Sequence, residues 1–418
     1  MRIRLGKKKG KSIERKNEAT VISPELQFIM FAFILALIFF PLFYYVYKIP
    51  YSGTPLYFDF ASKVLEGSLP YRDFALEYPP FALLFFIIPR LITSNYWTYA
   101  VFYRVEVFIF VLMGLFVIYR IAKRSGKATW KMLLFYILAI TAMGPIVAEQ
   151  YDIFPAILTL LALYTFWLGK HKTSWVLIAL GALTKIYPIF LAPILLIYYF
   201  RNRQYRLILS GISSLTSVIL AVLLPFLVIS FDSLWNLINY HSQRGIQLES
   251  VYSSFLLIAD KLGLTSISLV LNFGSWNIES QLADALAKIS PFVTVLLLVA
   301  AYGFTYKQIK PGKSQFTRIG TYALLVTAVV LISGKVLSPQ YLIWLIPFLP
   351  LVFGPSRNTL LAIFIAMGFL TYLILPVFYL ALIAVRIDTV VILLIRNILL
   401  ILLALMSAIS LRQMKPSD

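Results

Sequence analysis

The chain has 418 residues, of which 61% are hydrophobic and only 13% are charged, and its formal net charge is +20. Its mean hydropathy of +0.87 is far above that of soluble globular proteins, in which about half of the residues are apolar. The absence of cysteine excludes disulfides, thiolate nucleophiles and cysteine-ligated metals, and two histidines are too few for a histidine-rich metal site. Composition therefore predicts a polytopic α-helical membrane protein.

The chain begins with a basic segment that continues into apolar spans. Residues 1–25 are rich in Lys and Arg and lack a cleavable signal pattern, so we predict a cytoplasmic N-terminal tail. Apolar stretches able to cross a hydrocarbon core about 30 Å thick recur up to residue 411, and 412–418 are predicted to form a cytoplasmic C-terminal tail. We predict one all-α domain over 26–411 with about twelve transmembrane helices, at 26–48, 97–121, 131–147, 153–169, 173–184, 187–200, 207–230, 289–309, 317–334, 340–353, 358–380 and 388–411.

Positive charge falls on one side of this predicted topology. The basic clusters Arg2–Lys16, Arg120–Lys131, Arg201–Arg206 and Lys307–Arg318 all lie on the side of the two tails, which is the positive-inside bias of membrane proteins. We therefore expect a multi-pass cell-membrane protein with both termini in the cytoplasm. The excess charge indicates topology and contact with anionic membrane lipids, and it does not indicate a nucleic-acid partner.

The loop after the first span, residues 49–96, places carboxylates on the opposite, outer side. Asp59, Asp73 and Glu77 all lie in this loop, in a chain with few charges. Ionisable groups held against a membrane usually serve chemistry or transport, and the alternative is an ordinary solvated loop. The apolar segment 79–94 is short, and a crossing there would turn the next basic loop outward. We therefore predict an interfacial helix at 79–94 on the outer surface.

Further polar blocks follow on the same outer side between later spans. They are Gln150 and Asp152, then Lys185 and Tyr187, then His241, Arg244, Gln247 and Glu249, and finally Gln340 and Tyr341. Carboxylates, amides and aromatic rings suit sugar hydroxyls and ring faces, whereas Lys and Arg suit a phosphate. The longest outer loop, 231–288, is expected to hold part of a donor or acceptor site. Its apolar part, 251–271, either stays outside or dips into the membrane.

These blocks resemble, in order, the outer loops of the DUF2029 proteins, which form glycosyltransferase family 87. The resemblance rests on Asp59, Gly67-Ser-Leu-Pro-Tyr-Arg-Asp-Phe74, Glu77-Tyr-Pro-Pro80, Gln150-Tyr-Asp152, Thr184-Lys-Ile-Tyr-Pro188, the segment from His241 to Ser250, and Ser338-Pro-Gln-Tyr341. It implies a GT-C-type bundle with two juxtamembrane helices in the first outer loop, at 59–67 and 79–94. It also implies a polyprenyl-phosphate sugar donor, often of mannose, inversion at the anomeric carbon, and a catalytic Asp in that loop.

The implied reaction assigns roles to the candidate residues. Asp59 is the first candidate for the base that deprotonates the acceptor hydroxyl, because it begins the loop in which the family's catalytic Asp lies, and Asp73 is the second. Glu77 would orient the acceptor or a cation. Lys185 and Arg244 would offset the charge of the leaving phosphate, and His241 would bond it. The remaining residues expected to bind substrate are Gln150, Asp152, Tyr187, Gln247, Glu249, Gln340 and Tyr341.

Several of these residues also have a purely structural interpretation. Lys185 would snorkel to the interface, Arg244 would pair with Glu249, and Asp73 would pair with Arg72 or cap a helix. Gln150 and Asp152 would tie two helix ends together. Arg104 and Glu106 inside the second span are expected to pair or to face the protein interior, with a structural role or a place at the edge of the pocket. Arg396 in the last span is given no role in the site.

The sequence thus predicts an integral membrane glycosyltransferase that moves a hexose, with mannose expected, from a polyprenyl phosphate to an outward-facing acceptor with inversion. The acceptor would be a lipid, a glycan or a protein. No cofactor is predicted, and the need for a divalent cation is left open. The alternatives are a secondary transporter or lipid-linked-sugar flippase, which would also use charged groups and broken helices, and a scaffold for envelope assembly.

Overall fold

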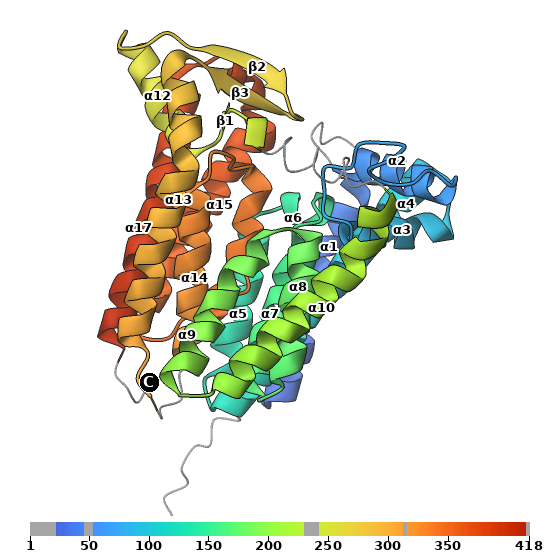
Figure 1. Ribbon diagram of the computed structural model, residues 1–418, viewed down its shortest axis with the longest axis vertical. Coiled ribbons are helices and arrows are strands. Elements are labelled where there is room, and N and C mark those ends of the chain that lie inside the picture. The colour runs from blue at the N-terminus through green and yellow to red at the C-terminus, as the bar shows by residue number, and fades with distance from the viewer. Residues whose placement is uncertain (1–21, 46–52, 230–241, 312–315, 415–418) are drawn as a thin grey trace, which may run out of the picture.

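The computed structural model describes residues 22–45, 53–229, 242–311 and 316–414, and it is a bundle of helices with a small sheet at one end (Figure 1). In chain order the helices are α1 (Pro24–Tyr45), α2 (Thr54–Leu65), α3 (Ala82–Ile92), α4 (Tyr96–Ser125), α5 (Thr129–Ala142), α6 (Ile146–Glu149), α7 (Ile153–Trp167), α8 (His171–Thr184), η2 (Tyr187–Leu191), α9 (Ala192–Arg201), α10 (Tyr205–Ile229), α12 (Val251–Lys261), α13 (Gln281–Gln308), α14 (Phe316–Ser333), η3 (Pro339–Leu345), η4 (Leu349–Leu351), α15 (Arg357–Tyr372), η5 (Leu373–Val377), α16 (Tyr379–Ile383) and α17 (Ile387–Gln413). The strands are β1 (Ile246–Gln247), β2 (Ser268–Asn272) and β3 (Ser275–Glu279).

The helices differ in how much of their apolar surface is buried within the protein. Helix α7 is apolar all round and most of its residues are buried, as in the centre of a bundle. By contrast, only 6% of the apolar stretch of α10 and 17% of that of α13 are buried within the protein. Apolar side chains left outside on such long helices face lipid in a membrane protein.

The predicted spans all have helical counterparts, but the count of twelve membrane crossings is not confirmed. In the part of the chain that the structure describes, six helices are long and apolar enough to cross a membrane: α1, α4, α10, α13, α17, and α15 together with its continuation to Val377. The other predicted spans correspond to shorter helices or to pairs of short helices separated by breaks, such as η3 and η4. Irregular backbone of this kind is tolerated at membrane depth where it lines a protein interior or a cavity.

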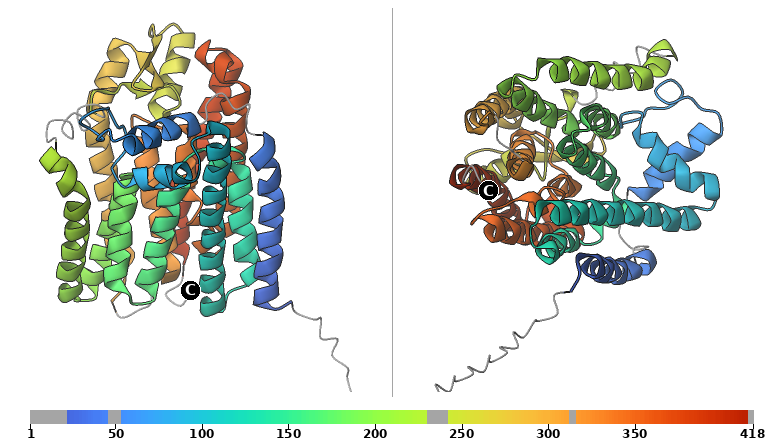
Figure 2. Two further views of the ribbon diagram at one scale, coloured as in Figure 1. Left: turned by 90° about the vertical axis from the view of Figure 1, so that its right-hand side faces the viewer. Right: turned by 90° about the horizontal axis from the view of Figure 1, so that it is seen from below.

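The first loop contains two short helices, as the resemblance implied. Helix α2 has Pro55 in its first turn and buries Tyr57, Phe60 and Ala61 on one face. The Tyr57 ring stacks on Phe86 of α3, with ring centroids 4.3 Å apart. Figure 2 shows α2 and α3 lying across the ends of the upright helices, between the far ends of the tilted α4 and α10.

A three-stranded antiparallel sheet, in the order β1-β3-β2, was not predicted. Strands β2 and β3 form a hairpin whose turn residues Phe273 and Gly274 both have positive φ, which matches the twist of a two-residue hairpin. The sequence left the position of 251–271 open. This stretch forms α12, which lies beside the sheet, and most of β2, which belongs to it (Figure 1). We call this end of the bundle the sheet end.

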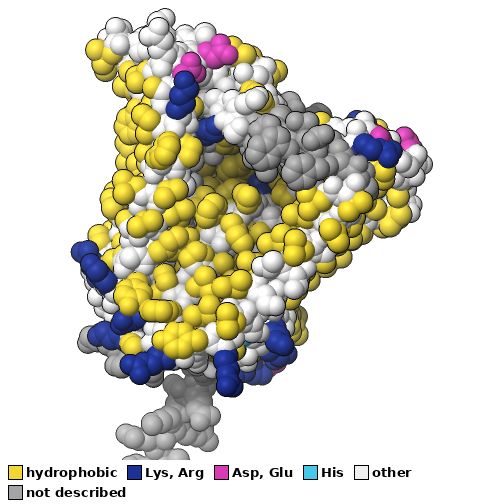
Figure 3. Space-filling model, viewed as in Figure 1, with side chains coloured by type: hydrophobic (Ala, Val, Ile, Leu, Met, Phe, Trp, Pro, Cys, Tyr) yellow, Lys and Arg dark blue, Asp and Glu magenta, His cyan; other side chains and the backbone are white. Residues whose placement is uncertain are grey.

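Positive side chains gather at the opposite end, which we call the basic end (Figure 3). The turns after α4, α9 and α13 lie there (Figure 1) and carry Lys127, Arg203 and Lys310. This separation of charge agrees with a basic end that faces the cytoplasm.

The chain has no cysteine, so single cysteines can report which end is outside. In intact cells, a membrane-impermeant maleimide should label cysteines replacing Ser68 or Ser242 at the sheet end. Cysteines replacing Ser125 or Lys310 at the basic end should be labelled only after permeabilisation. Labelling of the basic-end pair alone in intact cells would reverse the orientation.

Candidate functional site

A cavity of about 660 Å³ opens below the sheet, where the space-filling view shows a hollow surrounded by apolar side chains (Figure 3). Its wall combines the first loop, the α6–α7 junction, the break after α8, the segment around β1, the β2–β3 turn, the end of α14, and η3. The polar and charged side chains that line it are Glu77, Gln150, Lys185, Arg244, Gln247, Glu249, Ser275, Lys335, Ser338, Gln340 and Tyr341. The structure thus brings eight of the predicted site residues to one cavity, namely Glu77, Gln150, Lys185, Arg244, Gln247, Glu249, Gln340 and Tyr341.

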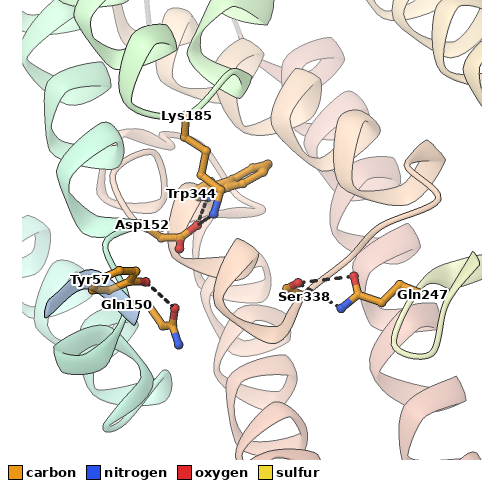
Figure 4. A network of polar contacts seen from close by, with 7 residues as sticks. All are labelled: Tyr57, Gln150, Asp152, Lys185, Gln247, Ser338 and Trp344. Carbon is orange, nitrogen blue, oxygen red and sulfur yellow. Dashed lines mark hydrogen bonds and ion pairs between the residues drawn. The ribbon is translucent and has the colours of Figure 1, made fainter. Parts of the chain in front are cut away.

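Lys185 is turned inward at this cavity and does not snorkel. Helix α8 ends at Thr184, and extended backbone at Lys185 (φ −157°, ψ 134°) redirects the chain. The Lys185 Nζ lies 2.5 Å from Asp152 Oδ1, and its side chain is only 11% exposed while that of Asp152 is fully buried. Trp344 Nε1 donates to the same carboxylate oxygen at 2.6 Å (Figure 4). One buried carboxylate therefore ties the start of α7 to the end of α8 and to η3.

Aromatic rings surround the Lys185 ammonium. It lies 4.6 Å from the ring centroid of Tyr151 and 4.3 Å from that of Tyr341. Tyr187 stacks on Trp344 with centroids 4.2 Å apart and planes at 4°. Cation–π attraction is strongest where water is excluded, so these rings and Asp152 together compensate the buried charge. The predicted site residue Tyr187 belongs to this packed cluster and does not line the cavity.

Two cations on the other wall have no carboxylate partner among the described residues. Arg244 Nη2 donates to Ser275 Oγ at 2.8 Å, and Arg244 Nε is buried without a partner in that part of the chain. Lys335 Nζ donates to the Ser242 carbonyl at 2.7 Å, and burial together with the nearby Arg244 lowers the pKa of Lys335. Two neighbouring positive groups in one cavity suit an anion.

The alternative interpretation, in which Arg244 pairs with Glu249, is wrong, because each side chain has another partner. Arg244 contacts Ser275, and Glu249 accepts a hydrogen bond from Tyr379. Lys335 was not predicted, since it is a single lysine at the end of an apolar span. The one signal for it was its position three residues before the Ser338-Pro-Gln-Tyr341 block.

The carboxylates of the first loop separate into two groups. Glu77 lines the cavity, whereas Asp59 and Asp73 do not. Asp59 lies 2.6 Å from Lys63, one helical turn away, on the partly exposed face of α2, and its side chain is 48% exposed. Asp73 pairs with Arg72 at 2.8 Å, which holds the pKa of Asp73 at about 2. Asp73 thus forms the ion pair with Arg72 that its structural interpretation describes, and of these three carboxylates Glu77 is the one at the cavity.

Amide side chains complete the polar lining. Gln150 Oε1 accepts a hydrogen bond from Tyr57 at 3.1 Å, and Gln247 Nε2 donates to Ser338 Oγ at 3.0 Å (Figure 4). Of the pair expected to tie helix ends, Asp152 does so, while Gln150 reaches the cavity. His241 lies outside the described residues. Within these residues, no three His, Asp or Glu side chains converge as metal ligands.

A second buried ion pair joins α4 to α6 beside the site. Arg104 Nε lies 2.6 Å from Glu149 Oε1, and each side chain is 2% exposed. The other carboxylate oxygen of Glu149 accepts from Thr54 Oγ1 at 3.1 Å. Arg104 is therefore paired, as expected of a charge inside a bundle, and its partner lies on a different helix. This pair fixes α2 and α6 against α4, next to Gln150.

Comparisons with known proteins identify a family and a fold. The family model described as glycosyltransferase family 87 matches residues 76–339, a range that includes most of the residues lining the cavity. Among solved structures, the chain is similar to ArnT from Cupriavidus metallidurans in the apo state, with a TM-score of 0.50 and 14% sequence identity over 92% of this chain and 77% of that chain. That likeness is one of fold, and it confirms the predicted GT-C-like bundle. No curated protein matches the chain.

The buried Asp152–Lys185 pair should matter most when only one partner is removed. Asp152→Asn or Lys185→Met would leave an uncompensated buried charge, which costs about 3–5 kcal/mol of stability. The double variant should recover much of this loss, because no charge is left unpaired. Thermal unfolding of the purified protein in detergent measures this, with Arg72→Met at an exposed pair as the control expected to leave the unfolding temperature unchanged. Additive losses in the double variant would contradict the coupling.

Proposed function

The chain belongs to glycosyltransferase family 87 and is a membrane glycosyltransferase of GT-C type, and we propose that it transfers a hexose, with mannose as the first candidate, from a polyprenyl-phosphate donor with inversion. The acceptor is an extracytoplasmic lipid, glycan or protein. The observation that carries this proposal is one cavity with Arg244 and Lys335 on one wall, Glu77 on another, and apolar helices beneath it. As a glycosyltransferase, the protein is neither the transporter nor the scaffold that the sequence alone left open.

A lipid-linked donor fits the surroundings of this cavity better than a nucleotide sugar. The apolar surface that leads to it (Figure 3) suits a polyprenyl tail, while the two cations suit a phosphate. Nucleotide sugars are made in the cytosol, and at the basic end the connections 126–128 and 202–204 are only short turns. The charge distribution supports a cytoplasmic basic end and an extracytoplasmic cavity.

The chemistry assigns a carboxylate and two cations to the reacting groups. Glu77 accepts the proton of the acceptor hydroxyl, whose oxygen attacks the anomeric carbon of the hexose from the face opposite the phosphate. The bond from the anomeric carbon to the phosphate oxygen breaks, and the phosphate leaves with the bonding electron pair. Arg244 and Lys335 offset the negative charge that develops on it.

We assign Lys185 a positioning role at the cavity and not the contact with the leaving phosphate that the sequence predicted. Its charge is already compensated by Asp152, so it is less suited than Lys335 to meet a phosphate. Lys185 and Asp152 instead fix the rings of Tyr341 and Trp344 at the cavity. Together with Gln150 and Gln340, these rings offer the flat apolar surface and amide groups that suit a sugar.

The choice of base can be tested with two matched variants. Glu77→Gln keeps the shape of the side chain but removes the proton acceptor, and we expect turnover to fall roughly 10²–10⁴-fold while donor binding is retained. Asp59→Asn should leave turnover near that of the wild type. The measurement is hexose transfer by purified protein in liposomes, with a polyprenyl-phosphate mannose and a membrane extract as acceptor. If Asp59→Asn abolishes turnover and Glu77→Gln does not, the two roles are exchanged.

The cation pair can be tested through donor binding. A charge-assisted contact contributes about 1.5–3 kcal/mol, so Arg244→Met and Lys335→Met should each weaken binding about tenfold or more. Lys310→Met, an exposed lysine at the basic end, is the control expected to bind as the wild type does. If the protein turns over a nucleotide hexose as sole donor, and neither cavity variant changes that turnover, the donor is not a polyprenyl-phosphate hexose.

Binding should also depend on pH through Lys335. Its lowered pKa means that the ammonium is lost at a lower pH than in an ordinary lysine, and only the charged form attracts phosphate. Donor affinity should therefore fall as pH rises through that pKa. In Lys335→Arg the guanidinium stays charged, so the affinity should persist to higher pH.

A further inference from the structure

The last two helical segments reach into the site and hold Glu249. Tyr379 of α16 donates its hydroxyl to Glu249 Oε1 at 2.8 Å. Arg396 of α17 donates from Nη2 to the backbone carbonyl of Glu249, also at 2.8 Å. The neighbouring Asn397 donates from Nδ2 to the carbonyl of Ser250 at 2.9 Å. All three contacts are long-range and buried, and they come from beyond residue 339, where the family match ends.

Burying the charged side chain of Arg396 at this position costs free energy. It lies in the middle of an apolar helix with a fully buried side chain. A guanidinium inside a membrane bundle is expected to pair or to serve function. Among the described residues, Nη2 donates to the main chain of the Glu249 segment, and Nε and Nη1 have no partner. The helix therefore carries a buried charge whose visible effect is to fix the position of one loop.

Glu249 itself is held ready for a hydrogen-bond donor. It lines the cavity although it is only 2% exposed. Tyr379 fixes Oε1, while Oε2 is buried and has no partner in the described part of the chain. Leaving a buried acceptor unsatisfied is costly, so such an oxygen marks a contact that a ligand completes. The Arg396 guanidinium, which donates to the Glu249 carbonyl, already places a positive charge at this residue, so a neutral donor such as a hydroxyl fits better than a second cation.

The position of Glu249 points to the donor sugar. It follows Arg244 and Gln247 on one short segment, and the Gln247 N–H donates to the carbonyl of Lys335 at 2.9 Å. The two cations proposed to hold the phosphate are thus joined through this segment to Glu249. The hexose is bonded directly to that phosphate, so its hydroxyls lie within reach of the same segment.

We propose that Glu249 is a specificity-determining residue that accepts a hydrogen bond from one hydroxyl of the donor hexose, and that Tyr379, Arg396 and Asn397 are positioning residues for it. This inference rests on the proposed function, because it requires a hexosyl phosphate at Arg244 and Lys335.

The test compares a polyprenyl-phosphate mannose with its monodeoxy analogues, each lacking one hydroxyl. For the wild type, kcat/KM should fall about 10–100-fold for one analogue, since a site built for a hydroxyl rejects the analogue without it. In Glu249→Ala, kcat/KM for the parent donor should fall to the value for that analogue. The ratio of the two kcat/KM values should therefore approach one. Tyr379→Phe and Arg396→Met should shrink the same ratio partly while kcat with that analogue stays close to the wild-type value.

The control is Arg386→Met, which removes an exposed charge at the start of α17 and should leave the ratio unchanged. If Glu249→Ala does not fold, as judged by thermal unfolding, Tyr379→Phe carries the test because it removes one hydroxyl only. A ratio that persists in the cavity variants, with all donors reduced equally, would overturn this inference and leave the proposed function standing. A wild-type protein that turns over no polyprenyl-phosphate hexose would overturn both.

Discussion

The site depends on one buried ion pair. Asp152 and Lys185 meet at 2.5 Å, almost without contact with solvent, and Trp344 donates to the same oxygen. Charges so placed are stable only when they are paired and hydrogen-bonded, so the start of α7, the end of α8 and the end of η3 must lie at one level. The breaks in these helices follow from that requirement. Extended backbone at Lys185 turns its side chain inward, and the rings of Tyr151, Tyr341 and Trp344 then pack around it.

Charges around the cavity divide into compensated and uncompensated ones. Arg104 with Glu149, and Lys185 with Asp152, are neutral as pairs and hold helices together. Arg244 and Lys335 form no ion pair among the described residues, and their nearest polar contacts are neutral oxygens. The positive charge that remains therefore belongs to Arg244 and Lys335, which line the same cavity as Glu77. The paired residues thus hold the helices together, whereas the unpaired cations are available to a charged ligand. The extent of burial alone would not separate these two groups.

The sequence predicted the bundle and most of the cavity wall, because hydropathy locates helices and polar blocks between apolar spans locate a rim. It failed where the outcome depends on helix face or on distant partners. Asp59 lies in the expected loop, but its position on α2 turns it toward Lys63. Arg104 meets Glu149, which is 45 residues away, and Arg396 meets a carbonyl 147 residues away. The hairpin of β2 and β3 was missed because its strands are five residues long and only partly buried.

The shortness of α8 has a consequence for the acceptor. Its 14 residues rise about 21 Å, whereas the hydrocarbon core is about 30 Å thick. If the helix starts at the membrane surface on the basic end, Lys185 and the rings beside it lie about 9 Å below the opposite surface. In the proposed reaction, the acceptor hydroxyl must therefore reach a point within the thickness of the membrane, so the acceptor enters the cavity and does not react at the membrane surface.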